Sequence, residues 1–79
     1  MSLETTIIKI ISDSLGVEID KITPESDFFK DLNADKVEVV DLILKVQQTC
    51  QVEIPEENYN QINTVADLVK VVEENSDEI

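Results

Sequence analysis

Apolar residues recur at spacings of three and four along three segments of this chain, and that pattern most constrains its fold. The first segment covers residues 3–15, the second runs from about Lys36 to Thr49, and the third follows Thr64. One glycine and two prolines leave few positions for tight turns, which disfavours a β-sandwich or barrel. The pattern predicts an all-α fold, a small bundle of three main helices and one short helix.

Residues that cap helices stand at the predicted ends of these segments. Ser2 precedes the first segment, and Gly16 follows its last apolar position. Asp35 precedes the second segment, and Glu38 three residues later completes a capping-box pattern. Thr64 offers a cap for the third helix. The expected apolar residues of the second helix are Val37, Val40, Ile43 or Leu44, Val46 and Cys50, with Val39 and Leu42 widening the apolar face.

A long connection of residues 17–34 separates the first two predicted helices. Both phenylalanines, Phe28 and Phe29, lie in it, so we expect it to be pinned to the core. Residues 52–55 should be extended, since a residue before proline avoids the helical region, and residues 56–61 should form one short helical turn. The chain is expected to be a single domain, residues 1–79, with an acidic tail that frays from about residue 74.

The charge of the chain excludes several classes of partner. It has 18 acidic residues, six lysines, no arginine and no histidine, which gives a net charge of −12. No basic stripe is available to neutralise phosphates, so we expect no nucleic-acid binding, and an anionic membrane surface is disfavoured. A partner with a basic surface is favoured, because opposite fields speed encounter.

The residue types that carry catalysis and metal binding are scarce. Without histidine or a glycine-rich phosphate loop, we expect no enzymatic activity and no catalytic residues. Residues 31–35 fit the opening of a calcium-binding EF-hand loop, but Lys36 and Leu42 replace its glycine and glutamate, so no metal site is expected. The lone Cys50 indicates a reducing compartment, and no stretch is long enough to insert into a membrane, so we expect a cytoplasmic protein.

The run from Phe28 to Leu42 resembles the core signature of acyl carrier proteins. That signature is roughly Asp-Leu-Gly-Ala-Asp-Ser-Leu followed by an acidic helix, and here it reads Asp31-Leu32-Asn33-Ala34-Asp35-Lys36-Val37. The resemblance extends to residues 15–17, 53–55 and 62–65, and so covers nearly the whole chain. It implies the four-helix bundle of the carrier proteins, with a prosthetic group attached at the start of the second helix.

Position 36 departs from the family pattern. The resemblance places there the serine that carries 4′-phosphopantetheine, but Lys36 has no hydroxyl for that transfer. We therefore expect no cofactor beside Asp35, Lys36 and Val37, although 4′-phosphopantetheine would be the family cofactor if residue 36 were serine. Either Lys36 is native to a divergent, non-acylated homologue, or it replaces the serine of a functional carrier.

The resemblance also implies a docking surface and an acyl pocket. The docking carboxylates are Asp35, Glu38, Asp41 and Glu56, facing basic surfaces of acyl-transfer, synthase or ligase enzymes. Gln47 and Gln48 are neutral where relatives are often acidic, which weakens the lower part of that surface. The candidates for the pocket lining are Phe28, Val40, Val46, Ile54, Ile62 and Leu68. Ordinary core packing is the other interpretation of these six residues, and the bulky Tyr59 would partly fill the pocket.

These inferences indicate a monomeric carrier-like domain of the fatty-acid or polyketide biosynthesis type, docking through its second helix. The alternative function is an acidic interaction or regulatory adaptor with no link to acyl transfer.

Overall fold

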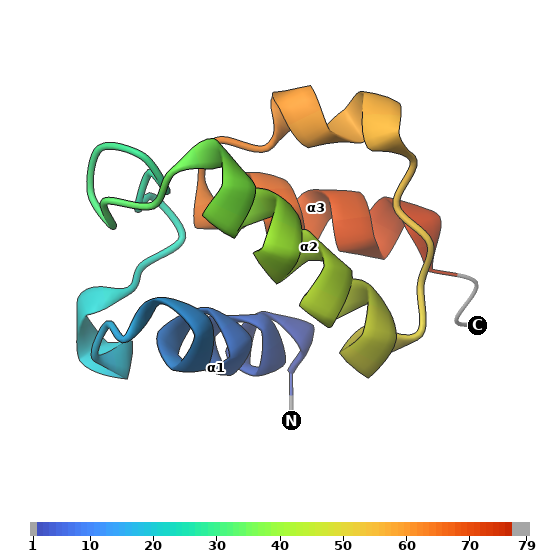
Figure 1. Ribbon diagram of the computed structural model, residues 1–79. Helices are drawn as coiled ribbons and strands as arrows, with labels where there is room; N and C mark the ends of the chain where they lie inside the picture. Colours follow the sequence, from blue (N-terminus) through green and yellow to red (C-terminus); the bar gives the residue numbers. More distant parts are fainter. Residues whose placement is uncertain (1, 77–79) are drawn as a thin grey trace.

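The computed structural model describes residues 2–76, and its regular elements are helical (Figure 1). It contains three α-helices, α1 (Leu3–Leu15), α2 (Lys36–Cys50) and α3 (Val65–Asn75), and two short 3-10 helices, η1 (Ile19–Lys21) and η2 (Glu56–Gln61). The predicted bundle of three main helices and one short helix is confirmed, with η1 as an additional turn in the long connection. No strand forms within residues 2–76, where one isolated β-bridge pairs Asp27 with Thr64.

The predicted capping residues set the ends of the helices. The Ser2 hydroxyl accepts a hydrogen bond from the Thr5 N–H, and Gly16 ends α1 in the left-handed region at φ 69°. The Thr64 hydroxyl accepts from the Asp67 N–H and caps α3 in the same way. Helix α2 ends without a glycine, because Gln51 adopts the left-handed conformation at φ 57°. The starts of α1 and α3 therefore follow local side-chain chemistry, whereas α1 and α2 end at a residue in the left-handed backbone conformation.

The core lies where α1 packs against both α2 and α3. In Figure 1, α1 lies at the bottom of the view, η2 at the top and α3 between them, and α2 crosses the view diagonally. The side chains that are less than 2 % exposed are Ile7, Ile11, Phe28, Leu42, Ile43, Val46, Ile62, Val65, Leu68 and Val72. They come from every α-helix and from both long connections, so a single core holds the chain together.

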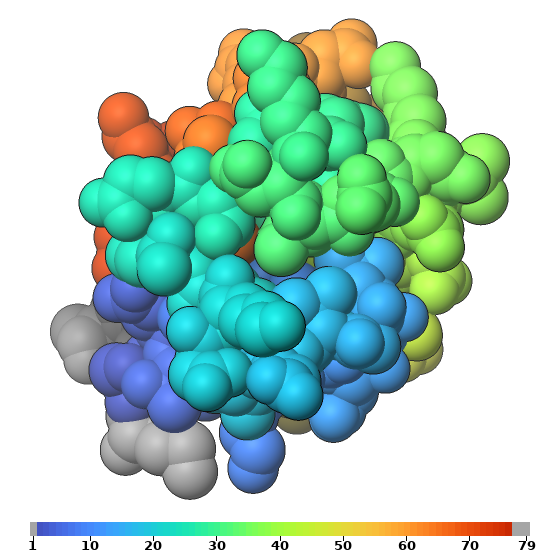
Figure 2. Space-filling model, turned by 90° about the vertical axis from the view of Figure 1, so that its left-hand side faces the viewer, coloured from blue at the N-terminus to red at the C-terminus, as the bar shows by residue number. Residues whose placement is uncertain are grey.

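Backbone hydrogen bonds pin the long connection to the start of α3. The Phe28 N–H donates to the Asn63 carbonyl at 2.8 Å, and the Val65 N–H donates to the Ser26 carbonyl at 3.0 Å. Phe28 is fully buried, as expected for a residue that pins the connection, whereas Phe29 is 39 % exposed. The connection spreads over one side of the molecule in Figure 2, between α1 and η2.

Residues 52–55 lead from α2 to η2 without regular secondary structure, and Pro55 lies at φ −59° and ψ 143°. The side-chain oxygen of Gln47 accepts a hydrogen bond of 2.6 Å from the Ile54 N–H and ties this segment to α2. The tail expected to fray from about residue 74 is helical up to Asn75, and residues 77–79 lie outside the described part of the chain. None of the described helices is long and apolar enough to cross a membrane.

Candidate functional site at the start of α2

A tight loop presents the first residue of α2. The Ala34 N–H donates to the Phe28 carbonyl at 2.8 Å, and this closes the loop between them. Asn33 stands where the family signature has glycine, and its φ of 58° lies in the left-handed region. Asparagine is among the few residues that adopt this conformation readily. The loop therefore has a left-handed residue at position 33 although no glycine stands there.

Asp35 and Glu38 close a capping box around this helix start. Asp35 Oδ1 accepts from the Glu38 N–H at 2.8 Å, and Glu38 Oε1 accepts from the Asp35 N–H at 3.0 Å. Both side chains remain exposed to solvent. Two of the predicted docking carboxylates therefore also stabilise the helix that carries them.

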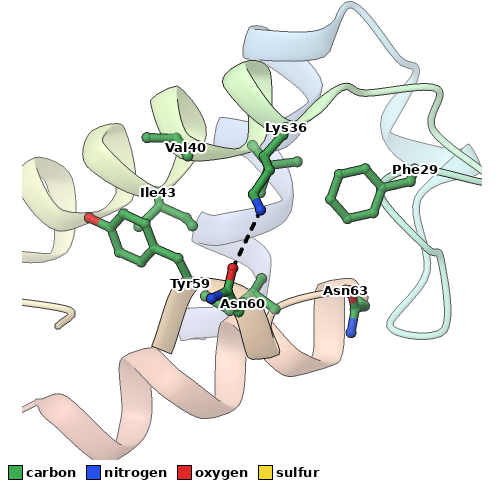
Figure 3. Close-up of a pocket in the computed structure, with 9 residues that line it drawn as sticks. Phe29, Lys36, Val40, Ile43, Tyr59, Asn60 and Asn63 are labelled. Carbon is green, nitrogen blue, oxygen red and sulfur yellow. Dashed lines mark hydrogen bonds between the residues drawn. The ribbon is translucent and has the colours of Figure 1, made fainter. Parts of the chain in front are cut away.

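Lys36 reaches from the start of α2 towards η2. Its Nζ donates to Asn60 Oδ1 at 3.5 Å, a long hydrogen bond between exposed side chains (Figure 3). Beneath this contact lies a cavity of about 220 Å³, which we call the α2–η2 cavity. Its lining residues are Phe29, Lys36, Val39, Val40, Ile43, Tyr59, Asn60, Ile62 and Asn63.

The predicted pocket lining coincides only in part with the lining of the α2–η2 cavity. Of the six candidates, only Val40 and Ile62 line the α2–η2 cavity. The other four pack in the core and do not line it; they are Phe28, Val46, Ile54 and Leu68. The structure therefore places these four residues in the core, which was the alternative interpretation of their apolar side chains. Sequence reasoning did not assign Phe29, Val39, Ile43, Asn60 or Asn63 to a pocket, because their meeting depends on how η2 lies against α2.

Tyr59 was expected to fill part of a pocket. It is half-buried instead, and its ring forms one wall of the α2–η2 cavity beside Ile43 (Figure 3). The cavity therefore stays open with a tyrosine at this position.

The predicted docking carboxylates lie on the surface. Glu38 and Asp41 are exposed along α2, and Glu56 is exposed at the first position of η2. Asp41 Oδ2 forms an ion pair of 3.4 Å with Lys45 Nζ, one helical turn away. Because this pair is solvent-exposed, it contributes at most about 1 kcal/mol to stability.

Two apolar side chains of α2 face outward between these acids. Val37 was expected in the inward apolar stripe, but the structure leaves it 77 % exposed, and Leu44 is 47 % exposed. Together with Lys36, Val40 and Asp41 they line a shallow groove on the outer face of α2. Positions 37, 40 and 44 follow one another at about one helical turn, so their side chains form a continuous apolar stripe on the outer face of α2.

The remaining candidate groups have ordinary structural roles. Cys50 is half-buried at the end of α2, and burial raises the pKa of its thiol. Within residues 2–76, no group of three histidine, cysteine, aspartate or glutamate side chains is placed to hold a metal ion.

Comparisons with known proteins agree with this arrangement. A family model described as "Phosphopantetheine attachment site" matches residues 5–72. Acyl carrier proteins from Helicobacter pylori strains J99 and G27 are 40% and 41% identical over 75 residues, 95% of this chain and 96% of each relative. A solved structure of an acyl carrier protein from Enterococcus faecalis matches with a TM-score of 0.78 and 31% identity, covering 94% of each chain. The chain belongs to the acyl carrier protein family.

Proposed function

We propose that this protein is a docking member of its family, of the fatty-acid or polyketide type, that is not phosphopantetheinylated at Lys36. The single observation that carries the proposal is the start of α2, where an intact capping box presents a lysine at the attachment position. Its partners are acyl-transfer, synthase or ligase enzymes with basic surfaces, and it acts as a monomer. We place it in the cytoplasm, because a lone cysteine suits a reducing compartment.

The chemistry of residue 36 does not fit covalent attachment of the cofactor. A phosphodiester at this position requires a hydroxyl, and Lys36 ends in an ammonium group that donates to Asn60. A lysine in the first turn also faces the positive end of the helix dipole, at a typical cost of about 0.3–1 kcal/mol. We therefore propose that the protein docks onto partner enzymes and does not carry an acyl group on a cofactor at Lys36.

The outer face of α2 supports docking. Protein interfaces combine apolar anchors at the centre with a charged rim that steers the partner. Here Val37 and Leu44 supply exposed apolar surface, and Glu38 and Asp41 supply the adjacent negative charge. A net charge of −12 extends this field well beyond the contact area and raises the rate of association with a basic partner.

The modification proposal is tested by intact-protein mass spectrometry. The wild-type chain and the variant Lys36→Ser are incubated with a phosphopantetheinyl transferase and coenzyme A. We expect no mass change for the wild type and a gain of one phosphopantetheine group for the variant. Lys30→Ser is the matched control, since it places a serine on the neighbouring loop and should stay unmodified. A mass gain in the wild-type chain contradicts the proposal.

The docking proposal is tested by measuring affinity for an acyl-transfer, synthase or ligase enzyme with a basic surface at two salt concentrations. Glu38→Gln keeps the capping-box acceptor and removes one charge, whereas Asp13→Asn removes a charge from the exposed face of α1. We expect weaker binding and a smaller salt dependence for Glu38→Gln, and wild-type binding for Asp13→Asn. Equal binding of both variants favours an adaptor that does not use α2.

A further inference from the structure

Lys36 supplies the positive charge of the groove on the outer face of α2. The other charged residue that lines this groove, Asp41, already has an ionic partner, because its Oδ2 lies 3.4 Å from Lys45 Nζ. Within residues 2–76, this is the only ion pair closer than 4 Å. Lys36 Nζ contacts the neutral Asn60 Oδ1 at 3.5 Å instead (Figure 3). The ammonium is therefore available to a group from outside the chain.

The docking face around Lys36 carries charges of both signs. Glu38 and Asp41 are exposed beside the apolar stripe and supply negative charge. A partner surface that is basic throughout would match these two carboxylates, but it would also bring a cation against Lys36. Like charges that face each other across an interface weaken binding and suppress the wrong partner. A matching partner therefore needs an anionic group opposite position 36.

The apolar stripe indicates which kind of segment covers this face. Val37 and Leu44 are 77 % and 47 % exposed, and at 1.5 Å per residue they lie about 10 Å apart along α2. Side chains at helical spacing form a ridge that packs into the grooves of a second helix. An amphipathic helix recognises such a surface with apolar anchors at the same spacings of three and four.

We propose that Lys36 makes this face selective for an amphipathic partner helix that carries one carboxylate among basic residues. The apolar side chains of that helix pack on the stripe, its carboxylate pairs with the Lys36 ammonium, and its basic residues face Glu38 and Asp41. The inference rests on the proposed docking through α2 and adds the charge pattern that the partner must present.

A phage-displayed library of helical peptides tests this selectivity. Each peptide has three fixed leucines at the spacing of the stripe, and its flanking positions are randomised among glutamate, glutamine and lysine. Selection on the wild-type chain should enrich lysine at most flanking positions and glutamate at one. By fluorescence anisotropy, the enriched peptide should bind up to about five-fold more tightly than its counterpart with glutamine at that position, as for an exposed ion pair. Equal affinities overturn the proposal.

Substitutions of Lys36 test which residue the glutamate recognises. Lys36→Glu should change the enriched residue from glutamate to lysine, and the neutral Lys36→Gln should bind the glutamate and glutamine peptides equally. Both variants should stay folded, because loss of a cation from the first turn suits the helix dipole, and circular dichroism checks this. Lys30→Glu makes the same charge change on the exposed loop outside the groove and should keep the wild-type preference. An unchanged preference in Lys36→Glu overturns the role of Lys36.

Substitutions in the stripe separate this inference from the docking proposal. Val37→Ser and Leu44→Ser should weaken binding of the enriched peptide, whereas Ile19→Ser should not, since Ile19 is a 51 % exposed apolar residue outside α2. Binding that survives both α2 substitutions, or a library without any enriched peptide, contradicts docking through α2 itself. Peptides that need the stripe but ignore residue 36 support docking and overturn the selectivity.

Discussion

Asp35 and Glu38 hold the start of α2 through two reciprocal hydrogen bonds, of 2.8 Å and 3.0 Å, between each side chain and the other's backbone N–H. The same two carboxylates belong to the proposed docking surface. A charge change at either position therefore acts on the helix as well as on the partner. Variants that separate these effects must keep an acceptor oxygen at each position.

Removal of the Asp35 cap should destabilise the fold. Asp35→Ala deletes the acceptor of the Glu38 N–H, and loss of such a cap costs about 0.5–2 kcal/mol in free energy of unfolding. Asp35→Asn keeps an acceptor at this position and should lose little stability, because asparagine is an equally good N-cap. Urea denaturation measures both values. Equal stabilities for the alanine variant and the wild type would show that the cap contributes nothing.

Gln47 should contribute to the stability of the fold. Its Oε1 accepts the Ile54 N–H at 2.6 Å, and Ile54 is only 4 % exposed. Gln47→Ala leaves that donor without its partner, at a cost of about 1–3 kcal/mol in free energy of unfolding. Gln48→Ala, at the next and exposed position, should change stability by less than about 0.5 kcal/mol. Thermal unfolding of the two variants checks the contrast, which fails if both unfold alike.

Two leucines on α2 should separate stability from docking. Leu42 is fully buried, and Leu42→Ala should lower the free energy of unfolding by about 2–5 kcal/mol. Leu44 is 47 % exposed, so Leu44→Ala should cost far less stability but weaken binding to a partner enzyme. Denaturation and binding assays on both variants give the comparison. Unchanged partner affinity in Leu44→Ala would remove this residue from the docking surface.

Asp27 should make stability depend on acidic pH. Its Oδ1 accepts from the Lys30 N–H at 2.9 Å and from the Phe29 N–H at 2.8 Å. The hydrogen bond from the Lys30 N–H lowers the pKa of Asp27 most, and burial opposes it. The hydrogen bond from Phe29 and the charge of Lys30 lower the pKa further, so it lies below its usual value of 3.8. Because the folded-state pKa is the lower one, the carboxylate stabilises the fold above the usual value, and this contribution is lost as pH falls through the folded-state pKa.

The variant Asp27→Asn isolates this effect, since it keeps an acceptor oxygen but does not titrate. The wild type should be the more stable protein near pH 7, and the difference should shrink as the pH is lowered below about 4. Asp13→Asn controls for the removal of one negative charge from the surface. Urea midpoints measured from pH 7 to pH 3 test the expectation, and a constant difference across that range would contradict it.

Much of the fold could be predicted from short-range features of the sequence. Ser2, Asp35 and Thr64 cap helices through side-chain contacts three residues away, and such contacts are encoded in a few adjacent positions. The spacing of apolar residues identified α1, α2 and α3, because each helix buries one face. The signature around Lys36 likewise predicts this residue as the attachment position.

The α2–η2 cavity and the exposed apolar stripe of Val37, Val40 and Leu44 depend on the tertiary structure alone. Val37 and Val40 share an apolar pattern with the buried Ile43, and only the packing of α1, α3 and η2 around α2 leaves Val37 in solvent. The α2–η2 cavity joins residues more than 20 positions apart, such as Lys36 and Asn60, where the side chains leave a gap. Periodicity records which face is apolar, whereas the volume left between two faces depends on how distant segments pack.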